Sequence, residues 1–549
     1  MSRKLINEIM KKIFTFALML FIQLVTNSSF AQIPNWQWAK SEGRVNASDY
    51  YNDICTDENG NTYITGNFNT ATITFGSTTL TNNSSGAKSD FFIVKYNISG
   101  NLVWAISAGG TDRDCAYGIC VDNNENVYLT GYFQSPTITF GATILTRKSF
   151  GTDVFVVKYD ANGNAVWSKN HGQQANDSGK SICVDTAGNC YVAGGFTSSS
   201  IDFGETTLTC SGYNDMFIAK YDAFGNVIWA IKQGGALNED VRGIDIDAAG
   251  NIYVTEVSQQ NDATTDIMTL KYDASGSYVQ GNIITGAKNE ECSGICADAA
   301  GNYYVTGSFK SLTITIGTLT LTNTNTNFST DFFIVKYDAA GNVAWAKNAA
   351  GTGNDYGKSI SVDASGNTYL TGTFQSSIIF DTTTLPISGS SNVFVAKYDA
   401  SGNLTWVINP EGFGYCYKIS TLASGDSFLT GCFSGPFSFG SITLTETEIT
   451  VENSNFFIAK LGNATGIVNM QNNSSNLTIY PNPAQNQLTI ETELNAKQKF
   501  DIVNIMGQIV YTSTIEKTTT IDLSQFSNGV YMIKIESEKL NIIQKFVKQ

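Results

Sequence analysis

The chain has 549 residues, of which 42% are hydrophobic, 12% aromatic and only 15% charged, and its formal net charge is −15. This length allows more than one domain and a large core, while abundant Gly, Thr, Asn and aromatic residues favour strands and turns over helices. A surface this acidic repels phosphate backbones, which argues against nucleic acid as a partner.

The first 31 residues have the pattern of a secretory signal peptide. Four basic residues lie between Arg3 and Lys12, and an apolar run follows from position 13 to position 25. Ser29 and Ala31 then supply small residues at the two cleavage positions. The apolar run is too short for a transmembrane helix with these flanks, and no later segment has the required length. We therefore expect residues 1–31 to be removed and the mature chain, without a transmembrane segment, to begin at Gln32.

From Gln32 to Gly462 the chain repeats itself about every 60 residues, a period typical of propellers and solenoids. Each unit contains two Asp-x-x-Gly-Asn turns, in which Asp and Gly match a type I turn followed by a residue of positive φ. Two such hairpins make four antiparallel strands, and four-stranded units repeated radially build a β-propeller. The first turns of the units begin at Asp57, Asp122, Asp185, Asp247, Asp298, Asp363 and, in degenerate form, Leu422.

The end of the repeat region predicts how the ring closes. The seventh unit stops at Lys460-Leu461 without the tryptophan that marks the last strand of most units, and an orphan copy of that strand lies at residues 35–40. We therefore predict an all-β, seven-bladed propeller over residues 32–461, in which the N-terminal strand completes the last blade beside residues 455–461. The tryptophans that mark the other last strands are Trp104, Trp167, Trp229, Trp345 and Trp406.

In most units a Phe-Gly excursion, such as Ile201-Asp202-Phe203-Gly204, leads from the first hairpin to the strand that carries Lys-Tyr. The fourth unit lacks this excursion, and it has Glu256 where other units have Gly and Gln280 in place of Trp. We interpret it as a trimmed blade. The Val-Asp-x-x-Gly-Asn-x-Tyr-x-Thr-Gly core of the repeat resembles the bacterial SBBP-type β-propeller repeat and, more loosely, the NHL-type blade, over residues 35–461. The resemblance implies the fold but not the activity, because members of such families have unrelated functions.

After a polar linker at residues 462–478, seven strand-like runs between turn residues predict a small Ig-like β-sandwich over residues 479–549. Five motif elements here resemble the type A sorting domain of the type IX (Por) secretion system. The resemblance implies a Bacteroidetes-type bacterium, an outer-membrane translocon as partner, and a cell-surface or extracellular location. The motif residues are Tyr480, Pro481, Asn482, Pro483, Gly507, Asp522, Leu523, Ser524, Gly529, Val530, Tyr531, Lys545, Phe546 and Lys548.

Catalytic histidine chemistry depends on one residue, because His171 is the only histidine in the chain. We expect it to be a solvated loop residue, which leaves no Ser-His or Cys-His arrangement and no histidine-rich metal site. Paired carboxylates could serve a glycosidase, but most belong to Asp-x-x-Gly-Asn turns, where they bond backbone N–H groups. No catalytic residue is therefore predicted.

One acidic column lies eight residues before each first turn, where the innermost strand of each blade begins. Such a ring at a channel mouth could hold a cation such as Ca²⁺, although we favour the interpretation that each carboxylate caps its own loop. No other cofactor is expected. The column consists of Asp49, Asp114, Asp177, Glu239, Glu290 and Asp355, with Gly414 in the seventh unit.

Cysteine and aromatic side chains give two further predictions. Four of the ten cysteines share one packing column. If Leu422 pairs with Asp426 across the first hairpin of the seventh unit, Cys416 and Cys432 stand directly opposite each other, and a disulfide between them is predicted. The Trp and Lys-Tyr columns are interpreted as packing between blades. Candidate sugar-binding aromatic residues are Tyr213, Phe224, Phe413 and Tyr415.

Three functions agree with these observations. The first is a binding scaffold for a glycan or a surface protein, with contacts on the loop face. The second is a glycosidase or lyase, which would need irregular acids converging in one pocket, whereas the acids here are regular. The third is a structural or adhesive surface protein without a pocket.

Overall fold

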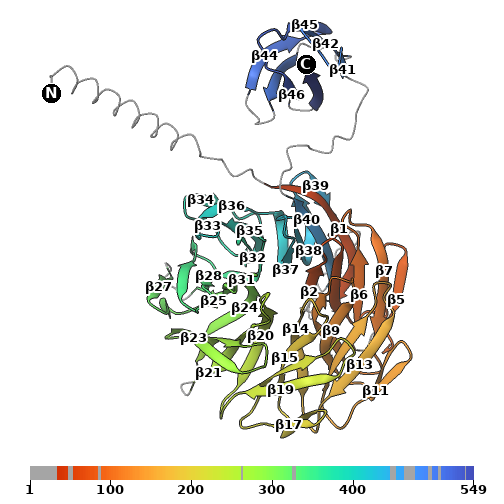
Figure 1. Ribbon diagram of the computed structural model, residues 1–549, viewed down its shortest axis with the longest axis vertical. Helices are drawn as coiled ribbons and strands as arrows, with labels where there is room; N and C mark the ends of the chain where they lie inside the picture. The colour runs from red at the N-terminus through yellow and green to blue at the C-terminus, as the bar shows by residue number, and fades with distance from the viewer. Residues whose placement is uncertain are drawn as a thin grey trace, which may run out of the picture. The chain divides into compact units, whose positions relative to one another are not determined.

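Figure 1 shows the computed structural model of the chain, which describes residues 34–46, 53–84, 88–260, 264–323, 329–445, 453–462, 477–492, 498–504, 509–537 and 540–549. These residues form strands and turns, and the chain divides into two compact units, Met1–Asn463 and Ala464–Gln549. None of them belongs to a helix that could span a membrane. The expected signal peptide and most of the expected linker lie outside the described residues.

The first unit is built from antiparallel sheets that each contain a path of four strands, as two hairpins per repeat predict. Seven such sheets occur in its described residues, and we number them along the chain. Sheets 1 to 4 contain β2 (Asp53–Thr56), β3 (Thr62–Phe68), β6 (Asp90–Tyr96) and β7 (Leu102–Ala108); β8 (Asp114–Val121), β9 (Val127–Phe133), β12 (Asp153–Tyr159) and β13 (Ala165–His171); β14 (Asp177–Val184), β15 (Cys190–Phe196), β18 (Asp215–Tyr221) and β19 (Val227–Gln233); and β20 (Glu239–Ile246), β21 (Ile252–Gln259), β22 (Thr265–Tyr272) and β23 (Tyr278–Gly286).

The remaining three sheets follow the same order, except that the last one takes its fourth strand from the start of the chain. Sheets 5 to 7 contain β24 (Glu290–Ala297), β25 (Tyr303–Phe309), β28 (Asp331–Tyr337) and β29 (Val343–Lys347); β31 (Asp355–Val362), β32 (Thr368–Phe374), β35 (Asn392–Tyr398) and β36 (Leu404–Ile408); and β37 (Glu411–Thr421), β38 (Ser427–Phe439), β40 (Asn453–Gly462) and β1 (Asn35–Asn46).

The first strands of the seven sheets form a closed circle. Each contacts the first strand of the next sheet, and β37 of sheet 7 contacts β2 of sheet 1. One hydrogen bond across this last step joins the hydroxyls of Thr56 and Ser420 at 2.9 Å. Figure 1 shows these strands toward the centre of the unit and the short hairpins toward its rim. The arrangement is that of a β-propeller.

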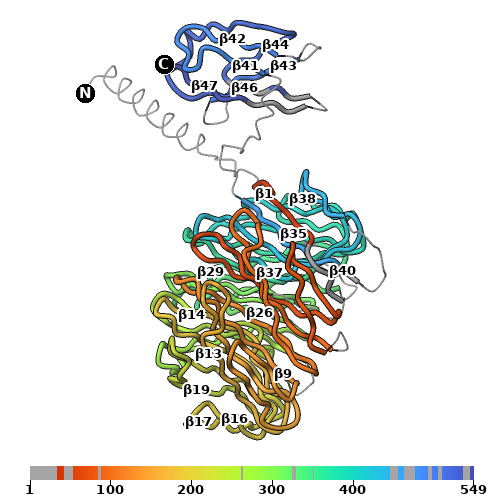
Figure 2. Tube along the Cα trace, turned by 90° about the vertical axis from the view of Figure 1, so that its right-hand side faces the viewer, coloured from red at the N-terminus to blue at the C-terminus, as the bar shows by residue number. Residues whose placement is uncertain are grey.

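The N-terminal strand closes this arrangement. β1 runs antiparallel to β40, with Ala39 opposite Ala459, which is the pairing that the orphan tryptophan strand predicts. β1 lies next to β40 at the edge of sheet 7, in the region where Figure 1 labels β1, β38 and β40; Figure 2 gives the view turned by 90°. Trp38 Nε1 donates to the carbonyl of Ile98 in sheet 1 at 3.1 Å, as Trp104 of sheet 1 does to Ala161 of sheet 2 at 3.0 Å. The same bond from Trp167 to Ala223 and from Trp345 to Ala400 links two further pairs of adjacent sheets, whereas sheet 4 has Gln280 in place of the tryptophan.

The Asp-x-x-Gly-Asn turns have the geometry that their sequence predicts. In the first turn, Gly60 has a φ of 77°, and Asp57 Oδ1 accepts hydrogen bonds from the backbone N–H groups of Asn59 and Asn61, each at 2.9 Å. Asp57 Oδ2 accepts the hydroxyl of Tyr63 at 3.0 Å, and Lys95 Nζ lies 5.1 Å from the centroid of that ring. These aspartates therefore hold turns and are not free for catalysis.

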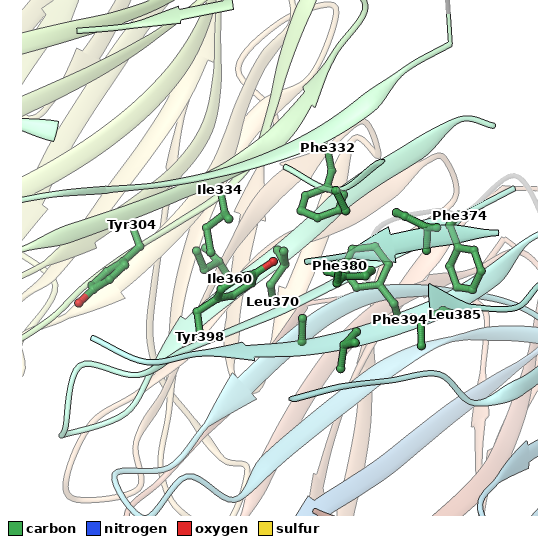
Figure 3. Packing of buried hydrophobic residues seen from close by; sticks show 14 of the residues in the cluster. Tyr304, Phe332, Ile334, Ile360, Leu370, Phe374, Phe380, Leu385, Phe394 and Tyr398 are labelled. Atoms are coloured by element: carbon green, nitrogen blue, oxygen red, sulfur yellow. The ribbon is translucent and has the colours of Figure 1, made fainter. Parts of the chain in front are cut away.

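The core lies between adjacent sheets, as Figure 3 shows for sheets 5 and 6. Phe332 of sheet 5 packs against Phe394 of sheet 6, with ring centroids 5.2 Å apart. Phe380 belongs to the excursion of sheet 6, where Asp381 takes the place of the usual Gly, and its ring lies 5.4 Å from that of Phe332. The phenylalanine of the excursion is thus a core residue, and the excursion covers the seam between two sheets.

Most excursions form two-stranded hairpins, but the one inserted in sheet 5 extends sheet 4. Its first strand pairs with β23, with Ile316 opposite Ile284, and so covers the sheet that lacks an excursion of its own. The short strands of the excursions and connections are β4 (Thr72–Phe75), β5 (Thr78–Thr81), β10 (Thr137–Phe140), β11 (Thr143–Thr146), β16 (Ser200–Phe203), β17 (Thr206–Thr209), β26 (Thr313–Ile316), β27 (Leu319–Thr322), β30 (Ala350–Gly351), β33 (Ile378–Phe380), β34 (Thr383–Leu385) and β39 (Ile442–Leu444).

The second unit consists of two antiparallel sheets around one core. The buried side chains of Leu488, Ile502, Ile533 and Phe546 belong to this core, which draws on both sheets. One sheet contains β41 (Leu477–Tyr480), β42 (Gln487–Thr492) and β45 (Thr518–Asp522); the other contains β44 (Ile509–Ile515), β43 (Gln498–Asn504), β46 (Gly529–Ser537) and β47 (Leu540–Lys548). The seven strands match the seven runs expected from the sequence.

Candidate functional site

Six of the seven innermost strands have a register break at the same position. One residue of the strand is left without a partner there, three residues after the position of the predicted acidic column. Such bulges redirect a side chain out of the regular alternation of a strand. We call these six the bulge residues: Tyr117, Lys180, Arg242, Ser293, Lys358 and Tyr417.

The bulge residues differ from one sheet to the next, although the strands that carry them are nearly alike. All six are half-buried or exposed, whereas the residue before each of them is buried. Lys180 Nζ lies 4.6 Å from the ring centroid of Tyr117 in the adjacent sheet, so side chains from neighbouring sheets meet there. We call the surface of the innermost strands that carries the bulge residues the inner wall. Burial lowers the pKa of Lys180, the charge of Asp240 raises it and the charge of Arg242 lowers it.

Other cations lie on the same inner strands. Arg242 forms an ion pair with Asp240 at 3.1 Å, and Lys418 of sheet 7 lies 3.6 Å from Asp53 of sheet 1. Burial raises the pKa of the Cys292 thiol, while the charges of Arg242 and Lys418 lower it.

The predicted acidic column is buried rather than open to a channel. Asp114, the first residue of β8, accepts hydrogen bonds from Gly110 N at 2.7 Å, Gln134 N at 2.9 Å and both donors of Ser135, at 2.7 and 3.1 Å. Asp177 accepts the corresponding set in sheet 3. This is the geometry of loop capping. Asp49 lies outside the described residues, and Glu239, Glu290 and Asp355 begin their strands in the same way.

The predicted acids have partners that the sequence reading missed. A second acid, at the start of the third strand of sheets 1 to 5 or one residue into it, is also buried and lies next to the capping acid of the following sheet. The charge of Asp114 raises the pKa of Asp90, and that of Asp177 raises the pKa of Asp153, although burial is the main cause in both. We call these the acid pairs: Asp90 with Asp114, Asp153 with Asp177, Asp215 with Glu239, Asp266 with Glu290 and Asp331 with Asp355.

A glycine-containing loop brings each of the first two pairs together. A Cβ atom on Gly109 would lie 2.1 Å from Asp90 Cγ, and the next residue, Gly110, donates its N–H to Asp114. Burial raises the pKa of Asp90 to about 7. In the same way burial, with a contribution from Asp331, raises the pKa of Asp355 to about 8. Such pairs favour the form in which one member keeps its proton.

The acids could have been found by aligning the third strands of the units. Asp begins the aligned segment in the five units that precede an acidic column member, and Asn392 precedes Gly414. No three His, Cys, Asp or Glu side chains in the described ranges form a group suited to a metal ion.

The predicted disulfide between Cys416 and Cys432 is wrong. The bulge at Tyr417 shifts the register by one residue, so Cys416 stands opposite Gly431 and Cys432 opposite Tyr415. Both cysteines are buried and neither forms a disulfide, and the hydroxyl of Tyr417 contacts Cys432 Sγ at 2.8 Å. The prediction assumed a regular hairpin, and the bulge removes that condition.

His171 is also placed differently from the prediction. It is the last residue of β13 and is buried, with its ring stacked on Phe203 at a centroid distance of 4.4 Å. Its Nδ1 lies 2.7 Å from the carbonyl oxygen of Asp202, and burial lowers its pKa to about 4. The excursion of sheet 3 covers this histidine, so it packs between sheets.

The four candidate sugar-binding aromatic residues do not form one site. Tyr213 and Phe224 are 76% and 79% exposed, but they flank opposite ends of β18 and so lie on opposite faces of the unit. Phe413 and Tyr415 do meet, with ring centroids 5.3 Å apart on the inner strand β37. Only this second pair lies on the strands that carry the bulge residues.

The sorting motif of the second unit is brought together from both ends of its sequence. Asn482 Nδ2 donates to the carbonyl of Lys545 at 3.1 Å, and Asn482 Oδ1 accepts the N–H of Val547 at 3.0 Å. Tyr531 stacks on Phe546 at 5.5 Å and donates its hydroxyl to the carbonyl of Ser527 at 2.8 Å.

The other motif residues hold turns or strand ends. Asp522 accepts the N–H of Ser524 at 2.8 Å, and Leu523 is buried. Pro481 and Pro483 follow the exposed Tyr480, while Gly529 begins β46 and is followed by Val530; Lys548 ends β47. Gly507 lies outside the described residues. The motif thus fastens the terminal strand β47 to the start of the unit.

Family comparison agrees with both resemblances. Residues 478–549 match the secretion system C-terminal sorting domain, and residues 37–68 match the β-propeller repeat. The chain is therefore an exported β-propeller repeat protein. More particularly, it carries a sorting domain for the type IX secretion system, which directs it to the cell surface or the extracellular space.

Individual relatives are distant. An uncharacterized WD repeat-containing protein of Acanthamoeba polyphaga mimivirus is 24% identical over 68% of this chain and 33% of its own length. The regulatory protein FlaEY of Caulobacter vibrioides is 24% identical over 42% of this chain and 24% of its own. The chain therefore spans a third or less of these two relatives.

Solved structures with a similar arrangement share little sequence. The β-propeller domain of the Trilobed protease from Pyrococcus furiosus is 9% identical, covering 76% of this chain and 98% of that one, with a TM-score of 0.37. A puromycin hydrolase is 8% identical, covering 76% of this chain and 58% of that one, with a TM-score of 0.40.

Proposed function

We propose that the chain is an exported binding scaffold. In this proposal residues 32–461 are a seven-bladed β-propeller, residues 462–478 are a linker, and residues 479–549 are an Ig-like sorting domain handled by the type IX translocon. The observation that carries the proposal is the set of bulge residues, which vary between sheets on strands that otherwise repeat. Varied side chains on a repeated frame are typical of a surface that recognises an irregular ligand.

The alternative of a glycosidase or lyase has weaker support. Catalysis by two carboxylates needs an ionised and a protonated acid that both reach substrate. The turn aspartates bond their own turns, the acid pairs are buried between sheets, and His171 is packed against Phe203. A Ca²⁺ ring at the acidic column is likewise disfavoured, because Asp114 and Asp177 already accept four hydrogen bonds each.

The test is a binding and turnover assay with the purified, exported chain. It is titrated against immobilised glycans and outer-surface proteins, and each binding partner is then incubated with the chain and analysed for cleavage. Saturable binding without product is expected. Formation of new reducing or unsaturated ends would favour the enzyme, and the absence of any saturable partner would favour a purely structural or adhesive role.

A further inference from the structure

We infer that the fourth strand of sheet 4, β23, belongs to a docking surface for a β-hairpin of another protein, which takes the place of the excursion that this sheet lacks. Tyr278 and Ile283 of β23 and Met268 of β22 form this surface. The bulge residues take no part in it, so the inference goes beyond the proposed binding at the inner wall and does not rest on it.

The other sheets show what covers the corresponding place. In five of them the phenylalanine of the excursion packs on a phenylalanine of the third strand, as Phe75 does on Phe92 in sheet 1, with ring centroids 4.7 Å apart. Each excursion therefore completes the apolar core of its seam. The third-strand phenylalanines of these five sheets are fully buried: Phe92, Phe155, Phe217, Phe394 and Phe457.

The turn of the excursion also lies over the first residue of the fourth strand. A Cβ atom on Gly76 would lie 3.5 Å from Leu102 Cδ2 in sheet 1. One on Gly317 would lie 2.9 Å from Val343 Cγ2 in sheet 5. Leu102 and Val343 are half-buried under these turns.

Sheet 4 lacks both contacts. Only residues 260–264 separate β21 from β22, and Met268 takes the position at which the other third strands have phenylalanine. Met268 is half-buried and stands opposite Ile283, which is 46% exposed. Tyr278, in the position of Leu102, is 59% exposed. Apolar side chains at positions that excursions cover elsewhere are therefore open to solvent here.

The same strand presents an unpaired backbone edge. β26 pairs with Ile284 to Gly286, whereas no described strand pairs with residues 278–283 on that side. This stretch has neither a charged residue nor a proline, which are the usual protection of such an edge. In other sheets the second strand of the excursion contacts the fourth strand, as β5 contacts β7 and β17 contacts β19. A hairpin on sheet 4 would lie beside the unpaired edge in the same way and find hydrogen-bond partners there.

The excursions also define the chemistry of the occupant. In sheet 1, Ile73 and Phe75 on one strand and Leu80 on the other are buried, while the residues between them are not. A partner hairpin with this alternation would bury three apolar side chains on the exposed surface of β22 and β23. A second copy of the chain does not supply it, because its described excursions hold their apolar residues in its own seams.

The test is fluorescence anisotropy with a labelled cyclic peptide of residues 70–81, which contains the excursion of sheet 1. The peptide is cyclised because an isolated two-stranded hairpin is only marginally stable. Saturable binding to the purified full chain is expected. The control peptide Phe75→Ser/Leu80→Ser should bind at least about tenfold more weakly, since two buried apolar side chains are lost. No binding of the first peptide, or equal binding of both, would overturn the inference.

The site is tested in the chain with Ile283→Thr, for which the dissociation constant of the first peptide should rise about tenfold. The matched control is Ile144→Thr, because Ile144 is 63% exposed but belongs to the excursion of sheet 2, and this variant should bind like the parent. If Ile283→Thr proves unstable, Tyr278→Ser replaces it and should weaken binding in the same direction. Unchanged affinity in a folded variant of this surface would contradict the assignment.

Light scattering of the chain alone separates a foreign partner from a second copy. A monomer is expected at the concentrations of the titration. A dimer that Ile283→Thr abolishes and Ile144→Thr leaves intact would show that a second copy covers this surface, and would refute the assignment to another protein.

Discussion

At the scale of single residues, the turn that begins at Asp122 lacks the glycine of the Asp-x-x-Gly-Asn pattern. Glu125 occupies the position of the glycine and has a φ of 62°, a conformation that disfavours residues with a Cβ atom. Its carboxylate forms an ion pair with Lys95 of sheet 1 at 2.7 Å and accepts a hydrogen bond from Asn59 at 3.2 Å. The contact between sheets thus offsets a strained backbone.

Two substitutions separate these effects. Glu125→Ala removes the ion pair but keeps the Cβ atom, whereas Glu125→Gly removes both. Glu125→Gly should therefore be more stable than Glu125→Ala by about 1 kcal/mol, measured by urea denaturation. Equal stability of the two variants would show that the backbone at this turn is not strained.

At the same scale, the misplacement of His171 shows a limit of sequence reading. A histidine before a Gly-rich loop reads as exposed, yet Phe203 and Tyr221 of the next sheet cover it. Those residues belong to the next unit along the chain, and no local pattern specifies that contact. The error is the same in kind as for the acid pairs, whose members come from adjacent sheets.

At the scale of elements, the acid pairs predict how stability depends on pH. Burial raises the pKa of Asp90 and Glu290 to about 7 and that of Asp355 to about 8. A raised pKa in the folded state contributes stability that is fully present below the unfolded pKa of about 4 and is lost as pH rises through the folded value. The melting temperature should therefore fall between about pH 4 and about pH 8 and level off above that.

The variant Asp355→Asn tests the origin of this slope, since Asn392 already stands in a junction without an acid pair. It should make the melting temperature less dependent on pH between about pH 4 and about pH 8. Asp160→Asn is the control, because Asp160 is only half-buried and hydrogen bonds from Asn164 lower its pKa. An Asp355→Asn slope as steep as that of the parent would contradict the assignment.

The motif of the second unit gives a further prediction at this scale. Asn482→Ala removes two hydrogen bonds to the terminal strand β47 and should destabilise the second unit by about 1–2 kcal/mol. Secretion should decline with it, measured as the fraction of the chain outside the cell. Gln485→Ala, an exposed neighbour, should secrete normally. Normal secretion of Asn482→Ala would show that the two hydrogen bonds between Asn482 and β47 are not needed for recognition by the translocon.

At the scale of the whole molecule, the repeat predicts most of the fold. The turns, the strands and the return of residues 35–40 to the last sheet follow from the Asp-x-x-Gly-Asn spacing and the missing tryptophan. The bulges do not, because the residue that bulges has no constant identity, and the register of Cys416 was misjudged for that reason. The candidate inner-wall site depends on these bulges. The sequence therefore predicts the ring of sheets but not which side chains lie on its inner wall.

The central claim is that both ends of the first unit meet to form one ring that supports the inner wall. The most direct measurement is disulfide formation in Ala39→Cys/Ala459→Cys, whose positions are directly opposite in the register of β1 and β40. We predict spontaneous linkage of these two cysteines by peptide mass spectrometry, with a higher melting temperature when oxidised. Ala39→Cys/Ile458→Cys, on opposite faces, should not link. Free thiols at positions 39 and 459, or equal linkage in the control, would contradict a ring closed by the N-terminal strand.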